Sequence, residues 1–237
     1  MTGYVLSALT FLLLLTSCAV QPVPSMLPIP TAVSEPTTIP TEQAIEPAIK
    51  VATDQILANT TIFRIIPGES QASYEVGETF LNQQNRFAVA IGVTTEINGE
   101  INAVLSDPPA SSIGPVTVDI SQLTSDSSRR DEAIRKRWLE SATYPLAVFN
   151  PVEISGLPAS YVEGEDYTFF ITGDLTVHEV TKPVTFNVLA NLNGNTLTGT
   201  ATTAVKLSDF GVGPISIAGI LNTEDDVKLT LTFVARS

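Results

Sequence analysis

The stretch Gly173-Asp-Leu-Thr-Val-His-Glu-Val-Thr-Lys-Pro-Val-Thr-Phe186 decides the fold of this chain. Apolar residues alternate with polar ones on either side of a polar centre, with Leu175 and Val177 before it and Val184 and Phe186 after it. Alternation with a period of two is typical of strands that bury one face. After the turn, Lys182-Pro183 is predicted to restart the chain in an extended conformation. The stretch therefore predicts two antiparallel strands joined by a tight polar turn.

The same alternation continues on both sides of this hairpin. We predict ten strands, at 62–66, 71–76, 87–95, 100–105, 116–120, 147–154, 167–176, 184–192, 196–206 and 227–235. Turn-forming residues separate many of them, for example Pro67-Gly68, Asn98-Gly99 and Asn193-Gly194-Asn195. Evenly spaced short strands of this kind form a sandwich or a closed barrel, and the pattern alone does not choose between the two.

Residues 131–140 form the one segment with a helical pattern. Ile134 and Trp138 are four residues apart and therefore share a face of the predicted helix. Ser127 or Ser128 precedes the segment as a candidate N-cap. In a small barrel, we expect such a helix to close one end.

Five motifs, in this order, resemble the YceI-like family. They are Arg130-Asp131, Tyr144-Pro145 with Phe149, the stretch 173–186, Ser208-Asp209-Phe210-Gly211 and the final strand from Asp226 to Leu231. The YceI-like family is a lipocalin-like group that binds long-chain isoprenoid and other amphiphilic lipids. The resemblance covers residues 62–235 and implies an all-β fold, an antiparallel lipocalin-like β-barrel with one short helix.

Two positions depart from the family pattern. Ala133 stands where the family usually carries a histidine after the Arg-Asp pair, and the region Tyr74–Glu78 also lacks the histidine expected there. Any family role that rests on those imidazoles is therefore absent or relocated in this chain.

The N-terminus predicts export and a lipid anchor. Val5–Leu15 is an apolar run too short to span a bilayer but suited to a signal-peptide core. Leu15-Thr16-Ser17-Cys18 resembles the bacterial lipobox, whose cysteine receives a diacylglyceryl group and becomes the first mature residue. The alternatives are a plain signal peptide or a short N-terminal anchor with an incidental cysteine. Because Cys18 is the only cysteine, the chain has no intramolecular disulfide and its domain has no thiol nucleophile.

The segment 18–60 is rich in proline and threonine, a composition that does not form a packed core. We therefore predict a lipoprotein signal peptide at 1–17, a lipid-anchored linker at 18–60 and the β-barrel domain at 61–237. This organisation places the domain outside the cytoplasm, tethered to the cell membrane on its periplasmic or cell-surface side.

The formal net charge of −13 makes a nucleic acid an improbable partner, because phosphates repel an acidic protein. The chain contains no G-x-S-x-G, no glycine-rich phosphate loop and no histidine-rich ligand set. His178, the only histidine, falls in the predicted turn. We interpret the acidic runs Glu163–Asp166 and Glu224–Asp226 as solvated hairpin tips rather than Ca²⁺ sites. We expect no catalysis, no metal and no cofactor other than a lipid ligand.

A barrel of about eight strands is either filled by side chains or holds one slender ligand. The small residues expected to face inward are Ala88, Ala90, Ala103, Ala190, Gly199 and Ala201. The bulky candidates for ligand contact are Trp138, Tyr144, Phe149, Phe169, Phe186 and Phe210. In such a barrel, core residues and ligand-wall residues overlap.

Arg130 belongs to a group of five cations, the others being Arg129, Arg135, Lys136 and Arg137. One interpretation is that the group receives a lipid head group, with Arg130 as a ligand-binding residue. The other is a solvated helix face, or an ion pair between Arg130 and a barrel carboxylate such as Asp131 or Asp174.

Two non-catalytic functions remain open from the sequence, and an enzyme that uses His178 and nearby carboxylates is the third hypothesis. The first is a non-catalytic lipoprotein whose barrel binds or carries a long-chain isoprenoid or another amphiphilic lipid. The second is an envelope β-domain with a filled core that binds protein or glycan. An elongated dry cavity favours the first, and a packed interior favours the second.

Overall fold

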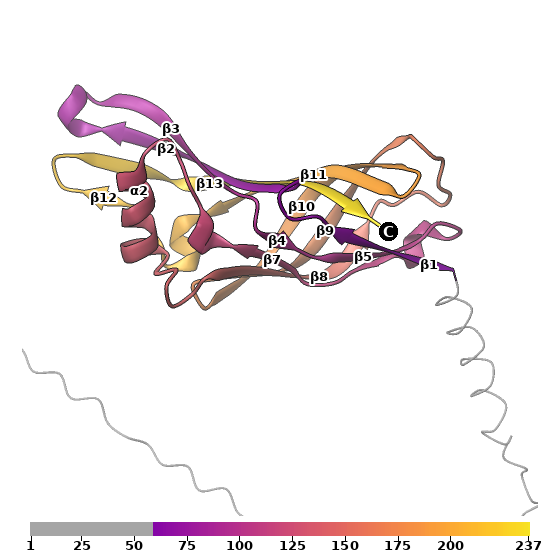
Figure 1. Ribbon diagram of the computed structural model, residues 1–237. Coiled ribbons are helices and arrows are strands. Elements are labelled where there is room, and N and C mark those ends of the chain that lie inside the picture. The colour runs from indigo at the N-terminus through magenta and orange to yellow at the C-terminus, as the bar shows by residue number, and fades with distance from the viewer. Residues whose placement is uncertain (1–58) are drawn as a thin grey trace, which may run out of the picture. The chain divides into compact units, whose positions relative to one another are not determined.

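A computed structural model describes residues 59–237 of the chain (Figure 1). It confirms the predicted class, because the described part is a curled, mostly antiparallel β-sheet with one short helix. The predicted signal peptide, the lipidation of Cys18 and nearly all of the 18–60 linker lie outside the described residues.

All ten predicted strands are present, together with three two-residue strands that were not predicted. The long strands are β1 (Thr60–Ile65), β2 (Gln71–Phe80), β3 (Arg86–Thr94), β5 (Glu100–Val104), β7 (Val116–Asp119), β8 (Leu146–Ser155), β9 (Asp166–Val177), β10 (Val180–Asn193), β11 (Thr196–Lys206) and β13 (Leu221–Arg236). The short ones are β4 (Ile97–Asn98), β6 (Ser112–Ile113) and β12 (Ser216–Ile217).

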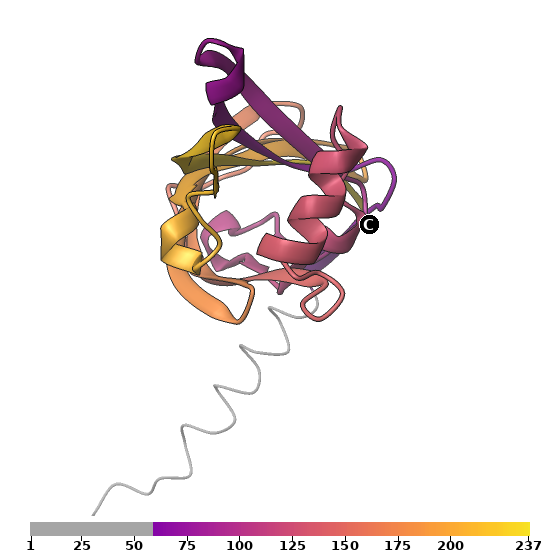
Figure 2. The same cartoon turned by 90° about the vertical axis from the view of Figure 1, so that its left-hand side faces the viewer.

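The sheet runs in the order β4-β7-β8-β9-β10-β11-β13-β1-β5-β6. Strand β4 lies at one end of this order and β5 lies near the other end, yet only Gly99 separates the two strands in the chain. The sheet must therefore curl so that its two ends approach each other. β1 and β2 both pair with β13, and β3 pairs with β2 at the margin. Figure 2 shows the resulting ring of strands, with the helix across one end.

The hairpin of the deciding stretch has a shorter turn than predicted. β9 and β10 are joined by His178 and Glu179, whose φ angles of 50° and 65° are the positive values typical of a two-residue hairpin turn. The returning strand therefore resumes at Val180, ahead of the predicted restart at Lys182-Pro183.

The acidic run Glu224–Asp226, expected at a hairpin tip, lies inside β13 instead. The pairing of β13 with β2 is irregular between Thr223 and Val227, which accommodates the run within the strand. Asp226 is paired there with Lys206 of β11.

The helix differs from the predicted 131–140 in both bounds and form. It consists of α2 (Ser128–Ala133) followed by a π-helical turn, η5 (Ile134–Trp138). The backbone N–H of Leu139 donates to the oxygen of Ile134 at 2.9 Å, a five-residue step that widens the last turn.

Candidate functional site

An elongated apolar cavity of about 390 Å³ runs through the interior of the curled sheet. Along β13 its lining extends from Thr223 to Phe233, ten residue steps that correspond to about 33 Å of extended strand. The volume lies within the roughly 300–1,000 Å³ typical of small-molecule sites. The interior is therefore not filled by side chains, and its shape suits a long, narrow ligand.

Five of the seven residues predicted to bind ligand line this cavity. They are Trp138, Phe149, Phe169, Phe186 and Phe210. The rings of Phe149 and Phe186 meet edge to face, with centroids 4.9 Å apart. Arg130 and Tyr144 lie outside the lining and have structural partners of their own.

Of the small residues expected to face inward, three line the cavity, Ala90 packs in a separate core cluster and Ala88 is only half-buried. Ala103, Ala190 and Ala201 line the cavity, where their short side chains leave space. Gly199 is needed for packing, because a Cβ at this position would lie 2.6 Å from the ring of Phe233. This glycine makes room for an aromatic side chain of the barrel.

The π-helical turn η5 contributes Ile134 and Trp138 to the lining, and Leu139 follows it. The shared face predicted for the first two residues is therefore the face turned to the cavity. Since α2 crosses one end of the ring (Figure 2), these three apolar residues close that end.

Within the described residues, Lys206 is the one charged side chain of the lining. Its Nζ lies 2.8 Å from Oδ1 of Asp226, and this hydrogen bond raises the pKa of Lys206. Sequence reasoning missed this residue, although it is the single charge in the strand predicted at 196–206. The side chain of Lys206 is half exposed, and its charge is paired with Asp226.

Arg130 forms the predicted ion pair with a barrel carboxylate, but this carboxylate is Glu78 rather than Asp131 or Asp174. Its Nε donates to Oε1 of Glu78 at 3.1 Å and its Nη2 donates to Oε2 at 2.9 Å, while Nη1 contacts Asp126. Burial alone would lower the pKa of Arg130, but its hydrogen bonds to Glu78 and Asp126 outweigh burial and raise the pKa. Arg130 thereby joins α2 to β2.

The predicted partner Asp131 is buried and accepts hydrogen bonds from Ser125 instead. Glu78 has a sequence signal that went unused: it continues the period-two series of Tyr74 and Val76, which line the cavity. A carboxylate at an inward position needs a cationic partner, which the helix supplies.

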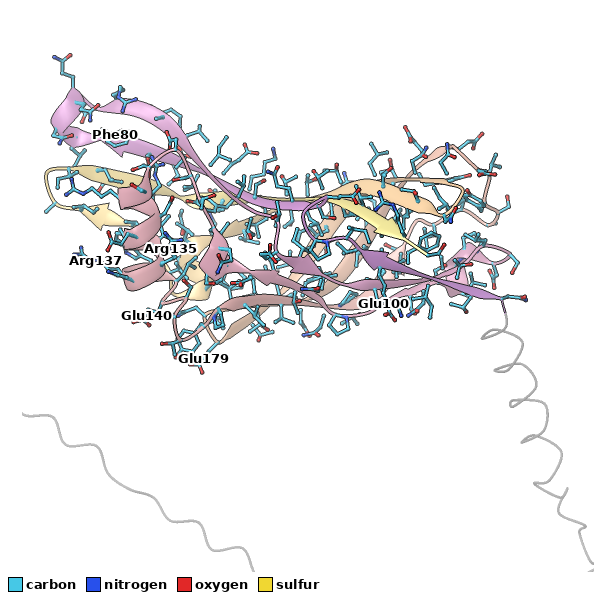
Figure 3. The ribbon with its side chains drawn as sticks, in the orientation of Figure 1. Phe80, Glu100, Arg135, Arg137, Glu140 and Glu179 are labelled. Carbon is cyan, nitrogen blue, oxygen red and sulfur yellow. The ribbon has the colours of Figure 1, made fainter. Side chains whose placement is uncertain are left out.

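Tyr144 belongs to a clasp around the β9–β10 turn. Its Oη donates to Oε2 of Glu179 at 2.9 Å, which raises the pKa of Tyr144, and its ring lies edge-on to His178 with centroids 4.7 Å apart. His178 Nε2 in turn lies 2.9 Å from Oε2 of Glu140. Figure 3 shows the labelled Glu140 and Glu179 at the same end as the helix. The clasp fixes the turn to the segment that follows η5.

Two negative findings apply to residues 59–237. No group of three or more histidine, cysteine or acidic side chains there is arranged to hold a metal ion. The helical segments of this part are too short and too polar to cross a bilayer.

Comparisons with solved structures place the fold. The chain matches Burkholderia cenocepacia BcnA with a TM-score of 0.56 and 22% identity, covering 72% of this chain and 98% of that one. It also matches a polyisoprenoid binding domain from Saccharophagus degradans, implicated in plant cell wall breakdown, with a TM-score of 0.55 and 12% identity, covering 74% and 98%.

Sequence comparisons agree. A UPF0312 protein of Pseudomonas putida is 32% identical over 145 residues, which is 58% of this chain and 71% of that protein. A UPF0312 protein of Photorhabdus laumondii is 34% identical over 109 residues, 43% and 53% of the two chains. The sequence model of the YceI-like domain matches residues 63–235, nearly the whole described part. The chain therefore belongs to the YceI-like domain family.

Proposed function

We propose that the barrel binds a long-chain isoprenoid or another amphiphilic lipid, with the chain of the lipid in the apolar cavity. The observation that carries this proposal is the cavity itself, about 390 Å³ of elongated space with an almost wholly apolar wall. The polyisoprenoid binding domain of Saccharophagus degradans shares the fold, which supports the same ligand class here. The cavity also argues against the alternative of an interaction module with a filled core.

The energetics support a lipid. Burial of one CH₂ group contributes about 0.8 kcal/mol, so a chain of about twenty carbons gains on the order of 16 kcal/mol before the costs of binding. Lost freedom on association costs about 4–15 kcal/mol. An aliphatic chain that fills the cavity therefore binds with net favourable free energy, and a polar head group can remain at a mouth of the barrel.

The proposal extends to location and to the absence of catalysis. The protein is a lipoprotein, lipidated at Cys18 and tethered outside the cytoplasm, and the barrel sequesters or carries its lipid without reacting with it. The lipobox-like Leu15-Thr16-Ser17-Cys18 supports the anchor. Two or more acyl chains give stable anchoring, where one chain alone is marginal. Metabolic labelling of the full chain with a radiolabelled fatty acid tests this, because Cys18→Ser abolishes the label if the anchor is right.

Trp138 provides a direct test of lipid binding, because it is the only tryptophan in the chain and it lines the cavity. We expect an isoprenoid alcohol to change the fluorescence of Trp138 saturably. Ala201 and Ala204 lie on the same strand, Ala201 buried in the cavity wall and Ala204 exposed. Ala201→Phe occupies the cavity and should abolish the change, whereas Ala204→Phe should retain it.

Melting curves of both variants control for folding. If both variants and the wild type give the same titration, the lipid does not enter the cavity and the proposal is wrong. Loss of the response in Ala201→Phe alone, with a melting temperature close to that of the wild type, supports it.

A further inference from the structure

Strand β3 (Arg86–Thr94) is paired with β2 along one side and is nearly open along the other. On the open side, Val93 and Thr124 exchange two backbone hydrogen bonds, of 2.8 and 2.9 Å. Backbone groups of alternate residues point the same way in an antiparallel strand. The N–H and C=O groups of residues 87, 89 and 91 therefore face the open side, and no bond to another described residue engages them there.

The side chains along this edge are exposed and apolar. Phe87, Val89 and Ile91 are 56%, 53% and 48% exposed. Proteins usually protect an open edge with a charge, a proline or a bulge. None of these occurs between Phe87 and Val93, and the pairing with β2 is regular throughout.

We propose that this edge pairs with the same edge of a second copy of the chain, antiparallel and about a two-fold axis at Val89. The open stretch is Arg86–Gly92, seven residues with Val89 at their centre. It is limited at one end by the hairpin turn, where Gln84 and Asn85 have positive φ angles. It is limited at the other end by the Val93–Thr124 bridge.

These limits fix a single symmetric register. Residue 89 lies opposite residue 89 of the partner, and residue 87 lies opposite residue 91. The outward backbone groups of both strands then meet one another as hydrogen-bonded pairs. On the outer face, Phe87 of each copy packs against Ile91 of the other, and the two Val89 side chains meet on the axis. The pairing is self-complementary and closed, so it ends at a dimer.

Charge favours a second copy as the occupant. The open stretch carries no carboxylate, although the chain has a net charge of −13. In the proposed register, Arg86 lies opposite Gly92 of the partner, next to the segment from Thr124 to Asp126 that borders the partner's strand. The side chain of Asp126 is 84% exposed but already pairs with Arg130 of its own chain. Arg86 likewise donates to Gln83 of its own chain, so what favours a second copy is that the open stretch brings no carboxylate against another.

The test is crosslinking of variants that each add one cysteine to the full chain. Directly opposed residues in this register have Cα atoms about 5.5 Å apart, whereas residue 91 and its counterpart lie four residue steps apart, about 13 Å. Val89→Cys should therefore form a covalent dimer with a short bismaleimide, with a yield on the order of tenfold above that of Ile91→Cys. A mixture of Phe87→Cys and Ile91→Cys chains should crosslink, although each alone does not. The parent chain, with Cys18 alone, measures the background.

A second measurement, sedimentation, determines whether the chain is a monomer or a dimer. Val89→Lys places two like charges on the axis and should give a monomer in sedimentation, whereas Leu189→Lys, on the outer face of the central strand β10 and 48% exposed, should remain a dimer. A wild-type chain that sediments as a monomer and shows no crosslink at Val89→Cys would overturn the proposal. Equal crosslinking at all three positions would also overturn it, because it would mean unspecific association through exposed apolar side chains.

Discussion

Arg130 of α2 and Glu78 of β2 form a two-point ion pair, with hydrogen bonds of 3.1 and 2.9 Å across 52 residues of chain. Both side chains are largely buried, and Glu78 has no other cationic partner among the described residues. This contact fastens the helix that closes the cavity to the wall of the barrel. Its loss should therefore affect both the stability of the fold and the closure of the cavity.

Glu78→Ala should lower the free energy of unfolding by about 2 kcal/mol, because it leaves the Arg130 guanidinium partly desolvated with only Asp126 and the hydroxyl of Ser125 as partners in the described part of the chain. Urea unfolding followed by circular dichroism measures this loss. Lys228→Ala, which breaks the exposed pair with Glu75, is the matched control and should cost less than about 1 kcal/mol. Equal losses in the two variants would mean that the Arg130–Glu78 pair does not fasten the helix.

Gly173 is the first residue of the stretch 173–186. It lies opposite Pro151 of β8, where the pairing of β8 with β9 becomes irregular. A Cβ at this position would lie 2.3 Å from the oxygen of Asn150 and 2.8 Å from the ring of Phe149. Gly173→Ala should therefore lower the free energy of unfolding by about 2 kcal/mol and the melting temperature by about 5 °C. At Gly114 the nearest atom to an added Cβ is 3.5 Å away, so Gly114→Ala should melt near the wild-type temperature.

Tyr74 should make the fold sensitive to alkaline pH. Burial is the main cause that raises the pKa of Tyr74 to about 12, against an ordinary value of 10.0. The folded state thus retains the phenol proton that the unfolded state loses. The associated stability is fully present below pH 10, declines as the pH rises above it, and is lost by about pH 12.

The decline should amount to about 1 kcal/mol between about pH 9 and about pH 11, and Tyr74→Phe should remove it. Urea midpoints at both pH values, measured for the wild type and for Tyr74→Phe, give the difference directly. Parallel pH profiles for the two proteins would show that Tyr74 ionises normally in the folded state.

Trp138 should control retention of the lipid, because it closes the helix end of the cavity. Trp138→Ala removes a large apolar contact, and we expect roughly tenfold weaker binding, equivalent to about 1.4 kcal/mol, together with faster release. Exchange with labelled lipid, followed by filtration, measures both quantities. Arg137→Ala, on the same helical turn but outside the lining, is the control and should bind as the wild type does.

The sequence predicted the strands well because the signal for them is local. Alternation such as Leu175, Thr176, Val177 reports directly which face of a strand is buried, and all ten predicted strands exist. The two-residue strands β4, β6 and β12 were missed because two residues carry no period. The π-helical turn was also missed, because the four-residue spacing of Ile134 and Trp138 suits an α-helical turn equally well.

Long-range partners were harder to predict than strands. The bulky residues that line the cavity were identified because inward aromatic residues of a barrel have few other places to lie. The partner of Arg130 was not, because pairing with Glu78 depends on how α2 docks on β2, which no local pattern encodes. The clasp of Tyr144 and Glu179 is hidden for the same reason.

Native mass spectrometry of the protein, purified from its own type of host envelope, shows whether the cavity holds a lipid. Residues 59–237 contain every strand and helical segment of the described fold, and this part should carry a discrete added mass. Organic extraction should release that mass as an isoprenoid or acyl lipid, and Ala201→Phe, purified in parallel, should lack it. A clean apo mass in the wild type, unchanged after incubation with isoprenoid lipids, would contradict the claim that the cavity is a lipid site.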